Sequence, residues 1–174
     1  MTTKLVISAL GADRSGIVDE LSNIIYDYGL NIEDSRMTVL GGEFAILLLI
    51  SGELTALDTL QASISDIEQE LQMSLLVRPT TDSIATGHTI PYSVEVAALD
   101  HPGIVSNIAG FFSSRNINIV NLQTESYSAP HTGSPMFALH MTVGISAEIN
   151  IAQLREAFMD TCDELNLDAE LTTI

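Results

Sequence analysis

A short set of residues that could bind an amino acid occurs twice in this chain. Each copy has an Asp, a Gly three positions later and an Asn fifteen positions after that, and the copies lie 87 positions apart: Asp13, Gly16 and Asn31, then Asp100, Gly103 and Asn118. Carboxylate and amide oxygens accept hydrogen bonds from an ammonium group, and free backbone N–H groups at a helix start hold a carboxylate. Together these groups suit an amino-acid zwitterion.

Each of these residues also has an ordinary structural role. Asp commonly caps a helix, Gly relieves close packing and Asn shapes turns. The duplication weakens this interpretation, because a cap position exchanges Asp with Ser or Thr, whereas both copies keep Asp and Asn. From the residues alone, both interpretations remain open.

The repeated set belongs to a longer repeat, which covers residues 13–38 and again 100–125. A repeat of this length is too long for a solenoid and predicts a duplicated small domain. We expect a first domain over residues 1–82, a linker over 83–90 within a Thr-, Ser- and Gly-rich stretch, and a second domain over 91–174.

Hydrophobic periodicity predicts the order strand, helix, strand, strand, helix, strand in each half. In the first half the strands are expected at 4–11, 31–40, 43–51 and 75–79, with helices over 17–28 and 57–71. The order predicts an α+β fold of two tandem ferredoxin-like domains, each with both helices on one face of a four-stranded sheet.

Local signals support these boundaries. The pair Gly41–Gly42 predicts a two-residue hairpin, and Gly29 with its counterpart Asn116 is expected to end the first helix of its half in a left-handed conformation. In the second half Pro102 suits the first turn of a helix, and seven extra residues are expected in the hairpin segment 127–135.

The strand over 44–50 is apolar at every position, so both of its faces are expected to be buried. The helices account for one face. The other repeat or a second chain would cover the other.

Charge and composition exclude several functions. The chain has 174 residues and a net charge of −17, with six Lys+Arg against 23 Asp+Glu. Nucleic-acid binding depends on cationic residues that neutralise phosphates, so direct DNA or RNA binding is disfavoured. The simplest interpretation of the charge is a solubilising surface, and the alternative is an acidic docking patch.

No metal, cofactor or catalytic residue is expected. The single cysteine, Cys162, excludes an internal disulfide and lies on a helix stripe, where a packed thiol is expected. The four His residues are scattered without metal-ligand spacing: His88, His101, His131 and His140. The longest apolar run, 44–50, is far shorter than the roughly 20 residues of a membrane span, so a cytoplasmic protein is expected.

At the repeated loops the chain resembles the ACT domain, a small ferredoxin-like module that commonly binds amino acids. The resemblance rests on Leu10-Gly11-Ala12-Asp13-Arg14-Ser15-Gly16-Ile17-Val18 with Asn31-Ile32, and on the second copy that begins at Leu99. A chain made of two such modules is similar to the glycine cleavage system transcriptional repressor family. Ser15 replaces the proline that is usual in that family's loop, and His101 replaces its arginine.

The resemblance implies a set of ligand-binding residues in each half. The first set is Asp13, Arg14, Ser15, Gly16, Ile17, Asn31 and Ile32, and the second is Asp100, His101, Pro102, Gly103, Ile104, Asn118 and Ile119. It also implies a non-enzymatic regulator of transcription that responds to an amino acid, glycine above all, and acts through a protein partner such as an activator instead of binding DNA. A homo-oligomer is compatible with this.

Two other functions remain open. One is an interaction module whose ligand sites have degenerated, and the other is a regulatory subunit of an enzyme of amino-acid metabolism. An RNA-recognition module shares the element order, but the strand over 43–51 has one Phe and no Lys or Arg, so we set it aside.

Overall fold

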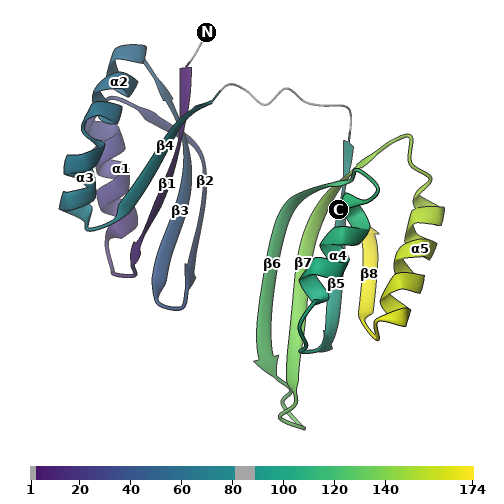
Figure 1. Cartoon of the computed structure of the whole chain (residues 1–174). Helices are drawn as coiled ribbons and strands as arrows, with labels where there is room; N and C mark the ends of the chain where they lie inside the picture. The colour runs from purple at the N-terminus through teal and green to yellow at the C-terminus, as the bar shows by residue number, and fades with distance from the viewer. Residues whose placement is uncertain (1–2, 81–88) are drawn as a thin grey trace. The chain divides into compact units, whose positions relative to one another are not determined.

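The computed structural model describes residues 3–80 and 89–174. Its contacts divide the chain into two compact units, Met1–Ile84 (unit 1) and Ala85–Ile174 (unit 2), drawn in Figure 1. Most of the expected linker over 83–90 lies outside the described residues, and so does His88.

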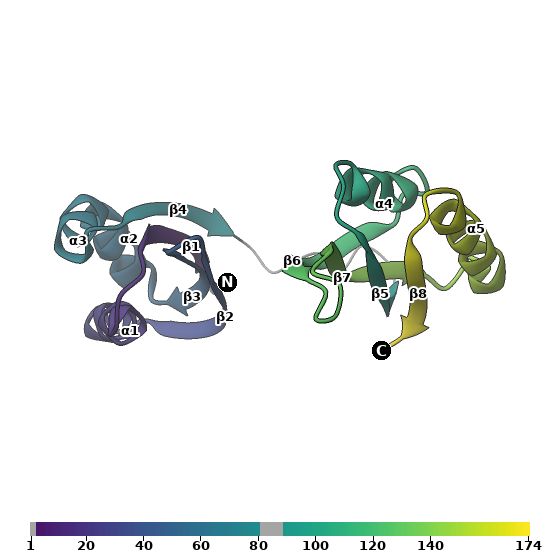
Figure 2. The same cartoon turned by 90° about the horizontal axis from the view of Figure 1, so that it is seen from below.

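Unit 1 is a four-stranded antiparallel sheet with helices on one face (Figures 1 and 2). Its elements are β1 (Thr3–Ala12), α1 (Ile17–Asp27), β2 (Asn31–Leu40), β3 (Glu43–Gly52), α2 (Leu54–Ala62), α3 (Ile64–Leu71) and β4 (Ser74–Thr80). The strand order is β2-β3-β1-β4, so β2 and β4 are the edges. This is the ferredoxin-like arrangement that the sequence predicts.

The expected single helix over 57–71 is wrong in one detail, because it is broken at Ser63 into α2 and α3. The Ser63 hydroxyl donates to the carbonyl of Thr59 at 3.0 Å, and its backbone angles (φ −95°, ψ 4°) leave the helical region. A serine hydroxyl that bonds to the preceding turn competes with regular helical geometry. The apolar stripe survives the break, since Leu57 and Leu71 on either side are buried.

Unit 2 repeats the fold with an unbroken second helix. Its elements are β5 (Thr89–Leu99), α4 (Ile104–Ser113), β6 (Asn118–Ser128), β7 (Pro135–Ser146), α5 (Ile151–Glu164) and β8 (Asp168–Thr173), in strand order β6-β7-β5-β8. The extra residues lie between Ser128 and Pro135, as predicted. Pro102 precedes α4 and is not in its first turn, because Gly103 is the N-cap.

The predicted chain reversals are confirmed. Gly41 and Gly42 both have positive φ, and Leu40 pairs with Glu43 across them. Gly29 (φ 71°) and Asn116 (φ 57°) follow the first helix of each unit in the left-handed conformation. Gly29 and Asn116 therefore set where β2 and β6 begin.

Each unit buries its own apolar core between the sheet and the helices. In unit 2 the rings of Phe111, Phe112 and Phe158 lie 5.2–5.3 Å apart between centroids. The predicted packed thiol is confirmed, because Cys162 is fully buried, and this burial raises its pKa to about 11. At neutral pH it is an apolar packing group instead of a nucleophile.

The face of the unit 1 sheet opposite the helices is open within the part of the chain that the structure describes. Leu10, Leu47 and Leu76 lie on it and are 51 %, 48 % and 58 % exposed. The helices of unit 1 therefore bury only one of the two apolar faces of β3.

Candidate functional site

In both units the loop that follows the first strand is tied to a hairpin. The backbone N–H of Asp13 donates to the carbonyl of Gly42 at 3.0 Å, and that of Asp100 donates to Pro135 at 2.9 Å. In Figure 1 the loop and the hairpin lie together at the lower end of each unit. The loop is therefore held by backbone contacts that do not depend on its side chains.

A glycine in the left-handed region opens the helix after each loop. Gly16 has φ 93° and Gly103 has φ 101°, values that an L side chain rarely adopts, so glycine is needed there for its backbone. Neither helix start receives a side-chain cap from the described residues, so Asp13 and Asp100 are not helix caps. The first-turn N–H groups point out of the helix without an intrahelical partner.

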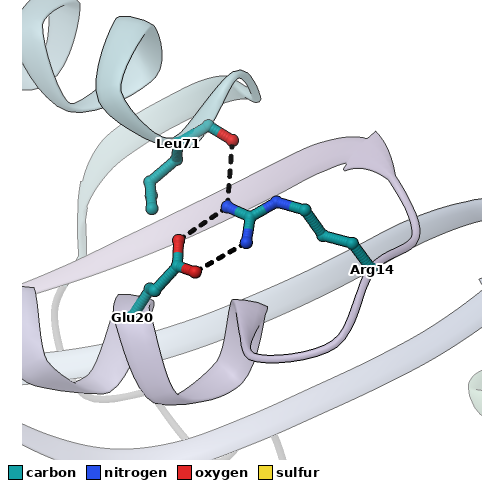
Figure 3. A network of polar contacts seen from close by, with 3 residues as sticks. All are labelled: Arg14, Glu20 and Leu71. Carbon is teal, nitrogen blue, oxygen red and sulfur yellow. Dashed lines mark hydrogen bonds and ion pairs between the residues drawn. The ribbon is translucent and has the colours of Figure 1, made fainter.

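In unit 1 an ion pair lies beside this helix start (Figure 3). The Arg14 guanidinium donates to both Glu20 carboxylate oxygens at 2.6 Å and approaches the carbonyl of Leu71, the end of α3, at 3.5 Å. The hydrogen bonds from Arg14 hold the pKa of the Glu20 carboxyl below its ordinary value, and those to Glu20 raise the pKa of Arg14. The pair joins the loop, α1 and α3.

The corresponding region of unit 2 has different polar contacts. His101 takes the place of Arg14, and its Nδ1 lies 3.1 Å from the carbonyl of Pro102. Asp100 Oδ2 accepts a hydrogen bond from the Ser126 hydroxyl at 3.0 Å, whereas the unit 1 counterpart of Ser126 is Val39, which cannot donate. The two Asp carboxylates therefore have different surroundings.

The side chain next to the glycine differs in charge between the units. A Cβ on Gly16 would lie 3.5 Å from Glu20 Oε1, and a Cβ on Gly103 would lie 3.6 Å from Asn107 Nδ2. In unit 1 the side chain beside the glycine is thus a carboxylate paired with Arg14. In unit 2 it is an amide, which can donate to a carboxylate.

The Asn residues lie far from the Asp loops within each unit. Asn31 pairs with Ser51, which also pairs with Lys4 near the start of β1, whereas Asp13 follows Ala12 at the end of β1. At about 3.3 Å per residue the length of β1 separates them by roughly 30 Å. Asn118, which pairs with Gly144, starts β6 in the same way. Neither unit brings its Asp and Asn together.

The other expected site residues divide by burial. Ile17 and Ile104 are 2 % exposed and belong to the cores, so only their backbone can face a ligand. Ile32 and Ile119 are partly buried and pack against the same cores, while Ser15 and Pro102 are exposed.

Sequence reasoning missed the residues that surround the loops. Glu20 and Asn107 lie on the first helical turn after the glycine, seven positions after each Asp, and that regular spacing was a usable signal. The matching β-bulges after Asn31-Ile32 and Asn118-Ile119 had no such signal in the sequence, because a bulge appears only in the strand register.

Three further observations bear on chemistry. Among residues 3–80 and 89–174 no group of three or more His, Cys, Asp or Glu side chains could hold a metal ion. A shallow depression on the unit 2 sheet is lined by Glu95, His140, Asp168 and Glu170, among others. In the part of the chain that the structure describes, every helix is too short or too polar to cross a membrane.

Known proteins match this chain in sequence and structure. Residues 3–78 match the ACT domain family. The glycine cleavage system transcriptional repressor of Escherichia coli (strain K12) is 29 % identical over 170 residues, 98 % of this chain and 90 % of the relative. A UPF0237 protein of Methanopyrus kandleri is 36 % identical over 70 residues, 40 % of this chain and 72 % of that protein.

A solved structure agrees with these matches. A crystal structure assigned to a glycine cleavage system transcriptional repressor has a TM-score of 0.76 and 27 % identity, and the match covers 100 % of this chain and 98 % of that one. Residues 3–78 therefore belong to the ACT domain family, unit 2 repeats their fold, and the chain as a whole is similar to the glycine cleavage system transcriptional repressors.

Proposed function

We propose that this protein is a non-enzymatic, cytoplasmic regulator that binds an amino acid, glycine above all, and controls transcription through a protein partner. The observation that carries the proposal is the similarity to a glycine cleavage system transcriptional repressor over 98 % of the chain. The duplicated glycine-opened loop adds a place where an amino acid can bind.

The ligand carboxylate would accept hydrogen bonds from the free N–H groups after Gly16 or Gly103. Asp13 or Asp100 lies in the same loop and would accept from the ammonium group. Since the Asn residues start at the far end of each unit, Asn31 or Asn118 can reach the same ligand only from a second module.

The edge strands offer a way to supply that second module. β2 and β6 are sheet edges, and apart from Ile32 and Ile119 their residues are exposed. An edge presents unpaired N–H and C=O groups that can pair with another strand. Antiparallel pairing of such an edge with the like edge of a second module would place the Asn end of one strand beside the Asp loop of the other.

An amino acid bound between two modules would favour one arrangement of them. A protein partner that recognises that arrangement would then respond to the ligand, because a ligand shifts an equilibrium by its difference in affinity for the two states. The acidic chain, at −17, supports contact with DNA through the partner instead of directly.

Ligand-dependent stability tests the binding step. If only the folded protein binds, glycine at 100 times its dissociation constant adds about 2.7 kcal/mol to the free energy of unfolding and raises the melting temperature. An unchanged melting temperature with every amino acid tested at millimolar concentration would remove the sensor function.

Mobility-shift measurements test the DNA step separately. The purified chain alone is expected to leave duplex DNA unshifted at moderate salt, and to alter the shift produced by a DNA-binding partner. A salt-sensitive nanomolar complex between this chain alone and DNA would contradict the proposal.

One observation favours a second candidate, an interaction module with degenerate sites. The Arg14–Glu20 pair occupies the region next to Gly16, where a ligand carboxylate would approach. If that candidate is correct, partner binding persists and no amino acid changes it.

A further inference from the structure

The two sheets carry different chemistry on the faces that their helices leave open. On unit 1 the centre of this outer face has five apolar side chains around Ser8: Val6, Leu10, Leu47, Leu49 and Leu76. They share one side of the sheet because Ser8 pairs with both Leu47 and Leu76, and Val6 pairs with Leu49. Paired residues of an antiparallel sheet point to the same face.

The equivalent positions on unit 2 are mostly polar. Strand pairing makes Ser93 the equivalent of Val6, Ala97 of Leu10, Thr142 of Leu49, His140 of Leu47 and Glu170 of Leu76. The ferredoxin-like fold therefore forms with a mostly polar centre on this face. The leucines of unit 1 need another reason, and a contiguous exposed apolar patch marks an interaction surface.

Charge distinguishes the outer face of unit 1 from the rest of the acidic chain. Three of the six Lys+Arg residues lie there, opposed by three carboxylates, so the face is neutral: Lys4, Arg36 and Arg78 against Glu33, Asp34 and Glu43. The unit 2 face carries four carboxylates and no Lys or Arg among the described residues: Glu95, Glu125, Asp168 and Glu170.

This difference indicates which occupant fits the apolar face. Two copies of a chain with charge −17 repel each other, and the repulsion is weakest where each presents a neutral surface. The leucines also need an apolar counterpart, because contact with the acidic unit 2 face would bury carboxylates without partners. The same face of a second copy meets both requirements.

We propose that the outer face of unit 1 is a dimer interface, packed against the outer face of unit 1 of a second copy. The contact is isologous, with both copies using the same residues. The two sheets would stack about 10 Å apart, with Leu47 and Leu76 of each copy in the apolar centre.

The edges of the face complement each other in charge. Asp34 on β2 and Arg78 on β4 lie in one row across the sheet, joined through Leu49 and Val6. A two-fold axis parallel to the strands sets β2 over β4 of the other copy, so that Asp34 faces Arg78 of the partner subunit. The Arg78 side chain has no ion-pair partner among the described residues of its own chain.

The size of the face sets the strength of the contact. Four strands about 4.8 Å apart and about seven residues long span roughly 450 Å² in projection. A face of four short strands is a small contact area, so the dimer is expected to dissociate on dilution. The inference does not depend on the proposed function, because it requires no amino acid.

Sedimentation equilibrium over a wide concentration range tests the proposal, with Leu47→Glu as the variant. The wild type should move from the mass of one 18.7 kDa chain to twice that mass. Leu47→Glu places two carboxylates in the apolar centre and should stay monomeric at every concentration. The matched control is His140→Glu, which adds the same charge at the equivalent position of unit 2 and should dimerise like the wild type.

Each alternative outcome would overturn the proposal. A wild type that remains monomeric means that the face is covered within one chain or by another protein. A Leu47→Glu variant that dimerises like the wild type places the interface elsewhere, and an equal loss in His140→Glu attributes the effect to charge alone. Circular dichroism checks folding, and Leu76→Glu replaces Leu47→Glu if the latter does not fold.

Discussion

Beside Gly16 in unit 1 the chain places Glu20, held by Arg14, whereas beside Gly103 in unit 2 it places the amide of Asn107. The backbone around the two glycines is nearly the same, with φ 93° and 101° and one hydrogen bond from each loop to its hairpin. The duplication has thus preserved the geometry that presents free N–H groups while the surrounding charges have changed. We expect a carboxylate ligand to approach the unit 2 loop more readily than the unit 1 loop.

The first prediction tests whether the two units can be compared as separate folded bodies. Phe112 is fully buried among Phe111 and Phe158, so Phe112→Ala should lower the free energy of unfolding of unit 2 by about 3–5 kcal/mol. Hydrogen exchange measured amide by amide should show the loss in β5–β8. The counterpart Ile25→Ala should produce the loss in β1–β4 instead, and equal losses in both units from either variant would contradict two separate cores.

The second prediction tests whether the two loops share their backbone requirement. Gly16→Ala and Gly103→Ala should each destabilise the protein by about 1–2 kcal/mol or more, because Ala is strained at these positive φ angles. Gly110 is the matched control, since it lies inside α4 with open space around it, and Gly110→Ala should stabilise by about 0.5–1 kcal/mol. Chemical denaturation measures all three. A loss at only one of the two loops would break the equivalence.

The third and smallest effect concerns the ion pair that distinguishes unit 1. The folded-state pKa of Glu20 is lowered by Arg14, so the pair contributes stability above the unfolded pKa of a Glu and loses it as pH falls through the lower folded pKa. Arg14→Ala should therefore be less stable than the wild type at neutral pH, and the difference should vanish in acid. Denaturation at a series of pH values measures it, and Glu20→Gln should show the same profile. A difference between Arg14→Ala and wild type that persists unchanged in acid would refute this role of the pair.

The sequence predicts much of the fold because its signals are local and occur twice. Gly41–Gly42 specifies a hairpin and Gly29 a helix end by backbone conformation alone, so these predictions needed no tertiary information. The break at Ser63 escaped prediction, since a serine is tolerated inside a helix and only its bond to Thr59 shows the interruption.

The candidate site was less predictable, because its members come together through tertiary structure. The sequence identifies Asp13, Gly16 and Asn31, but only the strand register shows that Asn31 lies at the far end of β1 from Asp13. The contact of Arg14 with Leu71 joins residues 57 positions apart, and no local pattern reports it. Spacing therefore predicts which residue types recur, and the topology decides which of them can touch one ligand.

Calorimetric titration with glycine tests the central claim, the binding of an amino acid by the repeated residues. The wild type should bind, and Asn31→Ala or Asn118→Ala should weaken binding by about 1.5–3 kcal/mol, because each removes an acceptor from a charged ammonium group. Asn150→Ala is the matched control: its side chain caps α5 by accepting from Ala152 and Gln153, so its loss should lower stability and leave affinity unchanged. Glycine binding that both Asn31→Ala and Asn118→Ala leave intact, or no binding of any amino acid by the wild type, would contradict the account.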